Sequence, residues 1–303
     1  MTKKTVSQIG EFGLIEKIQK SFSNGSSVLK GIGDDAAIVS LSEKKYIVLT
    51  TDMLVEDVHF KKSMPAEAIG HKAMACSLSD VAAMGGSPKF ALVSLGIPSR
   101  LPVKYVKSLY KGMEKMAARF STSIVGGDTV KSQKIIINVS LLGSVAPKHG
   151  VCRSGAKKGD IIFVTGPLGR SLKSGWHLKF IPRLKESQFL VQNCKPSAMI
   201  DVSDGLIADL GHILAMSRTG AILDETKIPL RKKATLRQAL YDGEDFELLF
   251  SMSPQKAGRL AKFALKGMRF YPIGEIIGVK QKIQLKRKNG LIQNLDVKGY
   301  VHF

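Results

Sequence analysis

The sequence predicts a two-domain protein of the α/β or α+β class. Helical and strand patterns alternate along both halves of the 303-residue chain, which is typical of layered folds. Residues 146–160, rich in Gly, Pro and Lys, show no periodicity and separate the halves. Hydrophobic residues make up 44% of the chain, so a core can form without disulfide bonds. We therefore expect domains at 1–148 and 149–303.

The first half alternates amphipathic and buried patterns. The apolar spacing predicts helices over 11–21, 65–84 and 103–120. Apolar runs predict buried strands over 45–53, 91–98 and 134–145. Between the last helix and the last strand, residues 121–129 (STSIVGGDT) predict a strand followed by a glycine turn.

The second half repeats this alternation. Strand patterns cover 161–166, 246–252, 273–278 and 282–287, and a strand edge is expected within AMIDVSDGL at 198–206. Helical patterns cover 205–217 and 256–266. Residues 168–195 show no clear pattern.

The charge and cysteine content limit the function classes. The chain carries 46 Lys and Arg against 25 Asp and Glu, a net charge of +21 that fits a nucleic-acid-binding protein. The lysines are dispersed, however, and we find no nucleic-acid-binding motif, so we expect solvated basic faces instead. Cys76, Cys152 and Cys194 form no CxxC pair, which indicates free thiols in a reducing compartment. Because residues 1–10 lack the apolar segment of a signal peptide and no stretch could span a membrane, we expect a cytoplasmic protein.

Acidic residues recur where the chain turns. Asp34 and Asp35 lie in GIGDDAAIV (31–39), and comparable settings hold Asp52, Asp80, Asp128, Asp201, Asp204 and the GEDFE segment at 243–247. Taken singly, such an Asp is an ordinary helix cap or turn residue. Asp80 differs, because it lies in an Ala-rich helical segment where a buried carboxylate needs a partner or a metal ion. Together, oxygen ligands without His or Cys favour Mg²⁺ and metal-assisted phosphate chemistry, although the chain has no P-loop motif.

A series of motifs runs in order along the chain: GIGDDAAIV, TTDMLVEDVHF, SLSDVAAMGGSPKFALVSLGIP, VGGDTV, CRSGAKKGD, IDVSDGL, GEDFELLF and GYVHF. Together these motifs resemble those of thiamine-monophosphate kinases over roughly residues 8–303. The resemblance implies transfer of the ATP γ-phosphoryl group to thiamine monophosphate, with several Mg²⁺ ions. It also implies a homodimer whose N-terminal sheets pair into a β-barrel, with ATP in a cleft between subunits and domains. The alternatives are an amidine-forming or carbamoyl-dehydrating enzyme of the same superfamily, or a basic nucleic-acid-binding protein.

The resemblance assigns roles to individual residues. The implied metal ligands are Asp34, Asp52, Asp80, Asp128, Asp201 and Asp204, assisted by Thr50 and Thr51. The implied ATP contacts are Tyr110, Gly127, Asp128, Arg153 and Ser203. The implied substrate contacts are His59, Glu244 and Tyr300. Two roles stay open for Asp35: it caps the turn, or it supports the metal ligands without binding the ion itself.

The chemistry of the acceptor agrees with these roles. A phosphate monoester has a second pKa of about 6, so its oxygen is largely ionised near neutral pH and no general base is expected. Glu244 could then face the cationic thiazolium ring and Tyr300 could stack on it. Ordinary alternatives are a half-buried strand histidine for His59, a surface ion pair for Arg153 and core packing for Tyr110. Asp57 and Asp242 stand where the family usually has glycine, which puts the substrate side in question.

Overall fold

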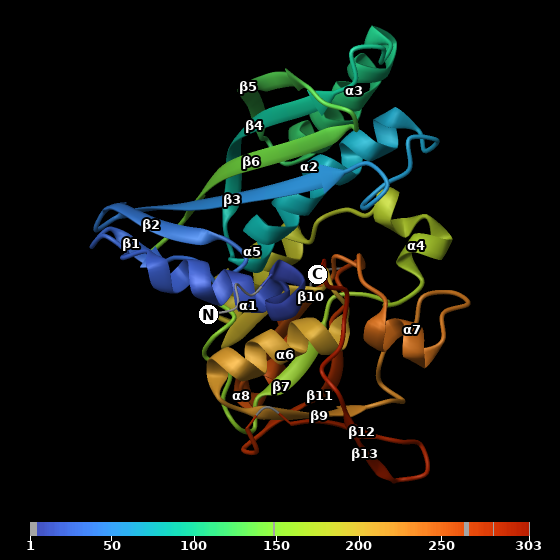
Figure 1. Ribbon diagram of the computed structural model, residues 1–303. Helices are drawn as coiled ribbons and strands as arrows, with labels where there is room; N and C mark the ends of the chain where they lie inside the picture. Colours follow the sequence, from blue (N-terminus) through green and yellow to red (C-terminus); the bar gives the residue numbers. More distant parts are fainter. Residues whose placement is uncertain (1–4, 148, 264–266, 281, 303) are drawn as a thin grey trace.

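The computed structural model describes residues 5–147, 149–263, 267–280 and 282–302. Three parts of the sequence-based expectations lie outside these ranges: the start of the N-terminal segment, the end of the helix expected over 256–266, and Phe303 of the GYVHF segment. The fold is α+β with two mixed sheets, shown one above the other in Figure 1. The sheets lie on either side of the boundary expected at 148/149, which stays a prediction.

The N-terminal sheet has the strand order β1-β2-β3-β6-β4-β5. Its strands are β1 (Val28–Lys30), β2 (Ala37–Ser42), β3 (Lys45–Val55), β4 (Ser87–Ile97), β5 (Ser123–Lys131) and β6 (Ile136–Val145). All neighbours are antiparallel except β4 and β5, which run parallel. The described strands form an open sheet and not a closed barrel.

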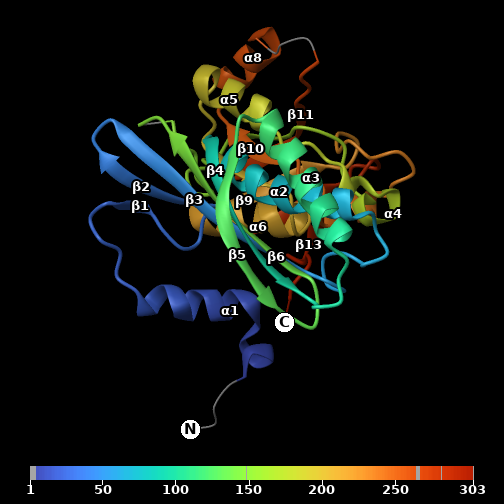
Figure 2. The ribbon, with the colours of Figure 1, turned by 90° about the horizontal axis from the view of Figure 1, so that it is seen from above.

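Two helices, α2 (Ala66–Ala83) and α3 (Val103–Arg119), cover one face of this sheet. They approach each other closely because glycine lies at both contact points. A Cβ on Gly70 would lie 1.9 Å from the Leu109 carbonyl oxygen, and one on Gly112 would lie 1.9 Å from that of Glu67. Helix α1 (Val6–Ser21) runs along the outside of the molecule and buries none of its residues (Figure 2).

The C-terminal sheet has the strand order β13-β12-β9-β11-β7-β10-β8. Its strands are β7 (Ile161–Val164), β8 (Ala198–Asp201), β9 (Gly220–Asp224), β10 (Leu248–Met252), β11 (Tyr271–Ile277), β12 (Ile283–Lys286) and β13 (Ile292–Leu295). Among the described strands of this sheet, β9 and β12 pair in parallel and all other neighbours are antiparallel. The helices of this half are α4 (Ser171–Ser174), the 3-10 helix η1 (Trp176–Leu178), α5 (Leu184–Asn193), α6 (Leu206–Ser217), α7 (Leu236–Tyr241) and α8 (Pro254–Phe263).

Helix α2 joins the two sheets. It packs against β3 and β6 of the first sheet and against β8 and α5 of the second half. Its Met74 and Leu78 belong to one buried cluster with Met199 and Phe250 of the C-terminal sheet. A second cluster fills the space between the other face of that sheet and α6. The segments that carry acidic residues are therefore held by one continuous core.

Most of the expected elements are present, with one correction. The glycine turn expected within residues 121–129 is wrong, because β5 runs unbroken from Ser123 to Lys131. Gly127 lies inside the strand, where a Cβ would come within 1.8 Å of the Val93 carbonyl oxygen, so its glycine serves close strand packing. The patternless segment 168–195 contains α4, η1 and α5. Among the described residues, no helix is both long and apolar enough to span a membrane.

Candidate active site

Three aspartates from distant segments meet at the junction of the two sheets. Asp35 precedes β2, Asp80 lies near the end of α2, and Asp201 ends β8. Each offers a carboxylate oxygen, and these oxygens lie within 4.8 Å of one another. The three segments meet because α2 packs on both sheets. We call Asp35, Asp80 and Asp201 the carboxylate cluster.

Hydroxyl groups orient the cluster and the neighbouring Asp52. Ser79 donates to Asp201 at 2.5 Å, and Thr50 donates to Asp80 at 2.5 Å. Ser77, one turn before Asp80 on α2, donates to Asp52 at 2.7 Å. The polar stripe Ser77–Asp80 of α2 therefore faces Thr50 and Asp52 within β3 and Asp201 at the end of β8, and it fixes acidic side chains from both sheets.

The pKa values of these carboxyl groups indicate that the site favours a cation. Burial raises the pKa of Asp201 to about 7, and the nearby charge of Asp35 adds to the rise. Burial also raises the pKa of Asp52, and it raises that of Asp80 well above its ordinary value, with Asp52 and Asp201 as repelling neighbours. Carboxylates held together out of water ionise readily only when a positive charge joins them.

The residues present fit Mg²⁺. Carboxylate and hydroxyl oxygens are the donors that this ion prefers. Asp35 Oδ2 is buried and has no hydrogen-bond partner among the described residues, so it is available to a ligand. Its other oxygen accepts from the Arg153 guanidinium at 2.8 Å. A basic group thus lies beside the cluster, as anionic phosphates would require.

The structure brings Asp35, in place of Asp34, into the cluster. The Asp34 side chain is 1% exposed, and its Oδ1 accepts from the Arg153 backbone N–H at 2.7 Å. Asp35 offers an oxygen beside those of Asp80 and Asp201, whereas Asp34 is not part of that group, although its Oδ2 is also buried without a hydrogen-bond partner among the described residues. Asp34 therefore ties the segment that joins the two halves to the first half, while Asp35 is the candidate metal ligand that the sequence left uncertain.

The loop after β8 carries Ser203 and Asp204 beside this cluster. Asp209 of α6 accepts from the backbone N–H groups of Asp204 and Gly205 and so fixes the loop. Burial raises the pKa of Asp204 to about 6, with Glu11 adding to the rise. Asp204, Asp209 and His212 form a second group of possible metal ligands.

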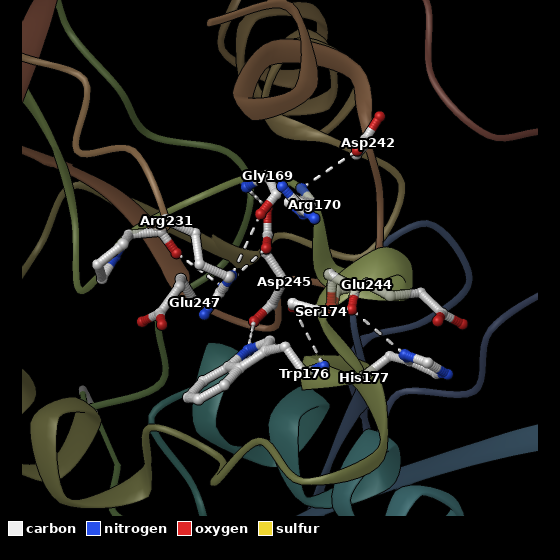
Figure 3. A network of polar contacts seen from close by, with 12 residues as sticks. Gly169, Arg170, Ser174, Trp176, His177, Arg231, Asp242, Glu244, Asp245 and Glu247 are labelled. Carbon is white, nitrogen blue, oxygen red and sulfur yellow. Dashed lines mark hydrogen bonds and ion pairs between the residues drawn. The ribbon is translucent and has the colours of Figure 1, made fainter. Parts of the chain in front are cut away.

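The GEDFE segment lies against the same loop and is held by a network of polar contacts (Figure 3). The Glu244 backbone N–H donates to the Ser203 carbonyl oxygen at 2.7 Å. Asp245 accepts from the Gly169 backbone N–H and from Arg231. The Arg231 guanidinium lies 4.2 Å from the ring centroid of Trp176, whose Nε1–H donates to the Asp245 carbonyl oxygen.

The Glu244 side chain faces α2 and the segment that contains His59. Its Oε1 accepts from the Lys72 ammonium, which also donates to the His59 carbonyl oxygen. The ring of His59 lies 5.2 Å from that of His302, centroid to centroid. The backbone N–H of Tyr300 donates to the Asp204 carbonyl oxygen, so the C-terminal segment crosses from the second half to His59. These contacts connect the segments that carry the three expected substrate residues, His59, Glu244 and Tyr300.

Comparisons with known proteins show the family of this chain. Residues 33–145 match the profile of the AIR synthase related protein N-terminal domain, and residues 175–286 match that of its C-terminal domain. The thiamine-monophosphate kinase of Aquifex aeolicus is 38% identical over 80% of this chain and 86% of its own length. That of Bacillus subtilis is 34% identical over 97% of this chain and 99% of its own. The chain belongs to the thiamine-monophosphate kinase family.

A solved structure extends the match to the whole fold of a thiamine-monophosphate kinase. The structure described as "AaThiL complexed with AMPPCP and TMP" superposes with a TM-score of 0.87 at 31% identity, covering 100% of both chains. A crystal structure of thiamine monophosphate kinase from Aquifex aeolicus gives a TM-score of 0.76 at 30% identity, covering 95% of this chain and 97% of that one. The domain order and both sheets are thus those of this kinase family.

Some residues expected at a kinase site lie away from the carboxylate cluster in the described chain. Asp128 pairs with Ser94, which projects from the sheet face opposite to buried Val93 and Leu95. The Thr51 hydroxyl contacts Asn138 and Ser140 on that same open face. Tyr110 lines a separate cavity of about 480 Å³ with Ser123 and Ile124, at the start of β5. Gly127 lies within β5 itself. Tyr110, Gly127 and Asp128 thus gather around β5.

Several residues that the sequence did not single out contact this site: Ser77, Ser79 and Asp209 hold the acids described above, Lys72 contacts Glu244, and His302 contacts His59. Lys72 is fully buried in α2. The sequence could have indicated this residue, because it is a single lysine in the Ala-rich segment that also contains Asp80. His302 lies in the GYVHF segment, in which the family resemblance assigned a role to Tyr300 alone. The structure also shows the contacts of Asp57 and Asp242, the two residues that stand where the family usually has glycine. Asp57 adopts a left-handed φ of 68° and contacts Lys61 and Lys134, and Asp242 accepts from the Arg170 backbone N–H.

Proposed function

We propose that this protein transfers the γ-phosphoryl group of ATP to thiamine monophosphate and so forms thiamine diphosphate and ADP. The observation that carries the proposal is the carboxylate cluster, which lies beside Arg153 and is followed by the loop whose Ser203 binds the Glu244 backbone. The names of the relatives specify the substrate, and the AMPPCP of the solved relative is an ATP analogue.

The residues of the cluster would hold Mg²⁺. Asp35, Asp80 and Asp201 supply oxygen ligands. Asp52 neighbours Asp80, and Asp204 lies on the loop after β8. When bound, the ion supplies neutralisation of the phosphate charges, which is the main obstacle to reaction between two anions. Arg153 adds a fixed positive charge, and its backbone N–H, bonded to Asp34, holds it in place.

The acceptor needs no general base in this proposal. The second pKa of a phosphate monoester is about 6, so the attacking oxygen is already ionised at neutral pH. The task of the chain is then to align acceptor and donor in line and to exclude water. Unphosphorylated thiamine, whose hydroxyl stays protonated, is expected to be a poor acceptor.

A second copy of the chain would complete the site. The open face of the N-terminal sheet presents apolar side chains at Leu49, Met53, Phe90 and Leu92, which are 38%, 56%, 50% and 48% exposed. Such a contiguous apolar face is typical of an interface, and a paired sheet would form the barrel that the family resemblance implies. Asp128 lies on this face, so it would reach a carboxylate cluster of the other copy. ATP would then lie between copies, with Tyr110 and Gly127 near it.

Product analysis tests the function directly. The protein is incubated with ATP, Mg²⁺ and thiamine monophosphate, and ADP and thiamine diphosphate are quantified together. The proposal expects both products in equal amounts. ADP release that is stimulated by an amide substrate, and not by thiamine monophosphate, would assign the chain to an amidine-forming reaction instead.

A further inference from the structure

Lys72 is a fully buried charged side chain that the proposed chemistry has not yet used. It is 0% exposed and lies on α2, about one and a half turns before the polar stripe that fixes the carboxylate cluster. Its ammonium donates to the His59 carbonyl oxygen at 2.8 Å and to Glu244 Oε1 at 2.5 Å. Burying an ammonium group costs free energy unless hydrogen-bond acceptors compensate for the lost water. We therefore infer the role of Lys72 from its two acceptors. Both acceptors belong to expected substrate residues.

Glu244 is held in a conformation that points to a ligand. Its φ is +63°, a left-handed backbone that non-glycine residues adopt at an energetic cost. Hydrogen bonds to Ser203 and from the Ser171 hydroxyl maintain it. Its second carboxylate oxygen, Oε2, is buried and has no hydrogen-bond partner among the described residues. A strained residue with one paired and one unpaired oxygen is arranged to accept a hydrogen bond from something bound beside it.

The ion pair also limits what Glu244 can recognise. Its negative charge is already balanced by Lys72, so the pair offers little net attraction to the cationic thiazolium ring. The pair instead offers an oriented hydrogen-bond acceptor, the Oε2 atom of Glu244. Thiamine monophosphate carries N–H donors in one place only, the amino group on its pyrimidine ring.

We propose that Lys72 is a positioning residue that holds Glu244 as the acceptor for the pyrimidine amino group of the substrate, and not as a counter-ion of the thiazolium ring. The inference rests on the proposed function and replaces the electrostatic role expected for Glu244. A buried acceptor left unpaired by the wrong ligand penalises that ligand strongly, so this contact would set substrate specificity.

Two substrate analogues test the wild-type enzyme. One replaces the pyrimidine amino group by a carbonyl oxygen, and the other replaces the charged ring nitrogen by carbon, which leaves the ring neutral. We expect the first to lose about tenfold or more in kcat/KM, mainly through KM, and the second to stay within about threefold of thiamine monophosphate. The reverse order of losses would overturn the proposal. Absence of turnover with thiamine monophosphate itself would instead contradict the proposed function.

The variant Lys72→Met separates positioning from folding. We expect its KM for thiamine monophosphate to rise about tenfold, its KM for ATP to stay within about twofold, and its preference for the amino over the carbonyl substrate to fall below about threefold. Lys107→Met, which removes an exposed lysine of α3, is the matched control and should leave all three unchanged. A purely structural role would leave the preference intact, and that result would refute the proposal. If Lys72→Met does not fold, the analogue comparison in the wild-type enzyme decides alone.

Discussion

Adjacent residues in GIGDDAAIV have different tasks. Asp34 binds the backbone of Arg153, while Asp35 points to Asp80 and Asp201 and pairs with the Arg153 guanidinium. The sequence predicted that these acids would converge, and Asp35, Asp80 and Asp201 do lie together in the structure. It could not tell which of the two buried neighbours joins the other acids, because that depends on how the 146–160 segment folds back. Lys72 shows the same limit, since its partner lies 172 residues away.

The two aspartates should respond differently to amide substitution. Asp35→Asn removes a charge from the cluster and should lower kcat by about 100-fold or more, as loss of an electrostatic contact at a reacting centre does. Asp34→Asn retains an acceptor for the Arg153 N–H and should lower kcat by less than about tenfold. Steady-state kinetics of both variants, with circular dichroism to verify folding, check this. A greater loss in Asp34→Asn would return the metal-ligand role to Asp34.

At the scale of elements, apolar patterns predicted the long helices α2, α3 and α6 and strands such as β3, β6 and β10, including elements that are buried on all sides. The prediction was wrong where glycine allows close strand packing instead of forming a turn. The two glycines before Asp128 were predicted to form a turn, but they lie within β5. It also missed α4, η1 and α5, whose short helices depend on contacts with the GEDFE segment and α2. Such elements are stabilised by the tertiary structure, and local sequence carries little record of them.

The close crossing of α2 and α3 makes a stability prediction. Gly112→Ala places a Cβ against the backbone at Glu67 and should destabilise the protein by about 1–3 kcal/mol, as overpacking does. Gly258→Ala, in α8 with nothing within 4 Å of the new Cβ, is the control and should be neutral or slightly stabilising. Chemical denaturation of both variants measures the difference. Equal stabilities would show that the helices can separate without cost.

At the scale of the whole molecule, the open sheet face and the position of Asp128 are the basis of the proposed dimer with shared sites. The sequence predicted the fold class, with one mixed sheet in the first half and alternating elements in the second. The pairing of sheets stays a proposal that depends on the family resemblance, because an exposed apolar face does not identify its partner.

A charge on this face should separate the copies. Leu92→Glu buries an unpaired carboxylate at the proposed interface and should convert a dimer to a monomer in light-scattering chromatography. Leu172→Glu, at a 61% exposed position on α4, is the control and should leave the mass unchanged. A dimer that survives Leu92→Glu would place the interface elsewhere.

Shared sites also predict complementation. Asp80→Asn and Asp128→Asn should each be inactive alone, because every site of either homodimer lacks one carboxylate. Mixed dimers would contain one intact site, so denaturing and refolding the two variants together should restore about a quarter of wild-type activity. No recovery, with mixed dimers demonstrated, would mean that Asp80 and Asp128 act within one copy.

The central claim is that the carboxylate cluster holds Mg²⁺ for phosphoryl transfer to thiamine monophosphate. The most direct test is the rate of thiamine diphosphate formation across a Mg²⁺ titration, in wild-type protein and in Asp80→Asn. We predict a saturable dependence on Mg²⁺ in the wild type, abolished by chelation, and a rate at least about 100-fold lower in the variant even at high Mg²⁺. Undiminished turnover in Asp80→Asn, or in chelated wild-type protein, would contradict the account.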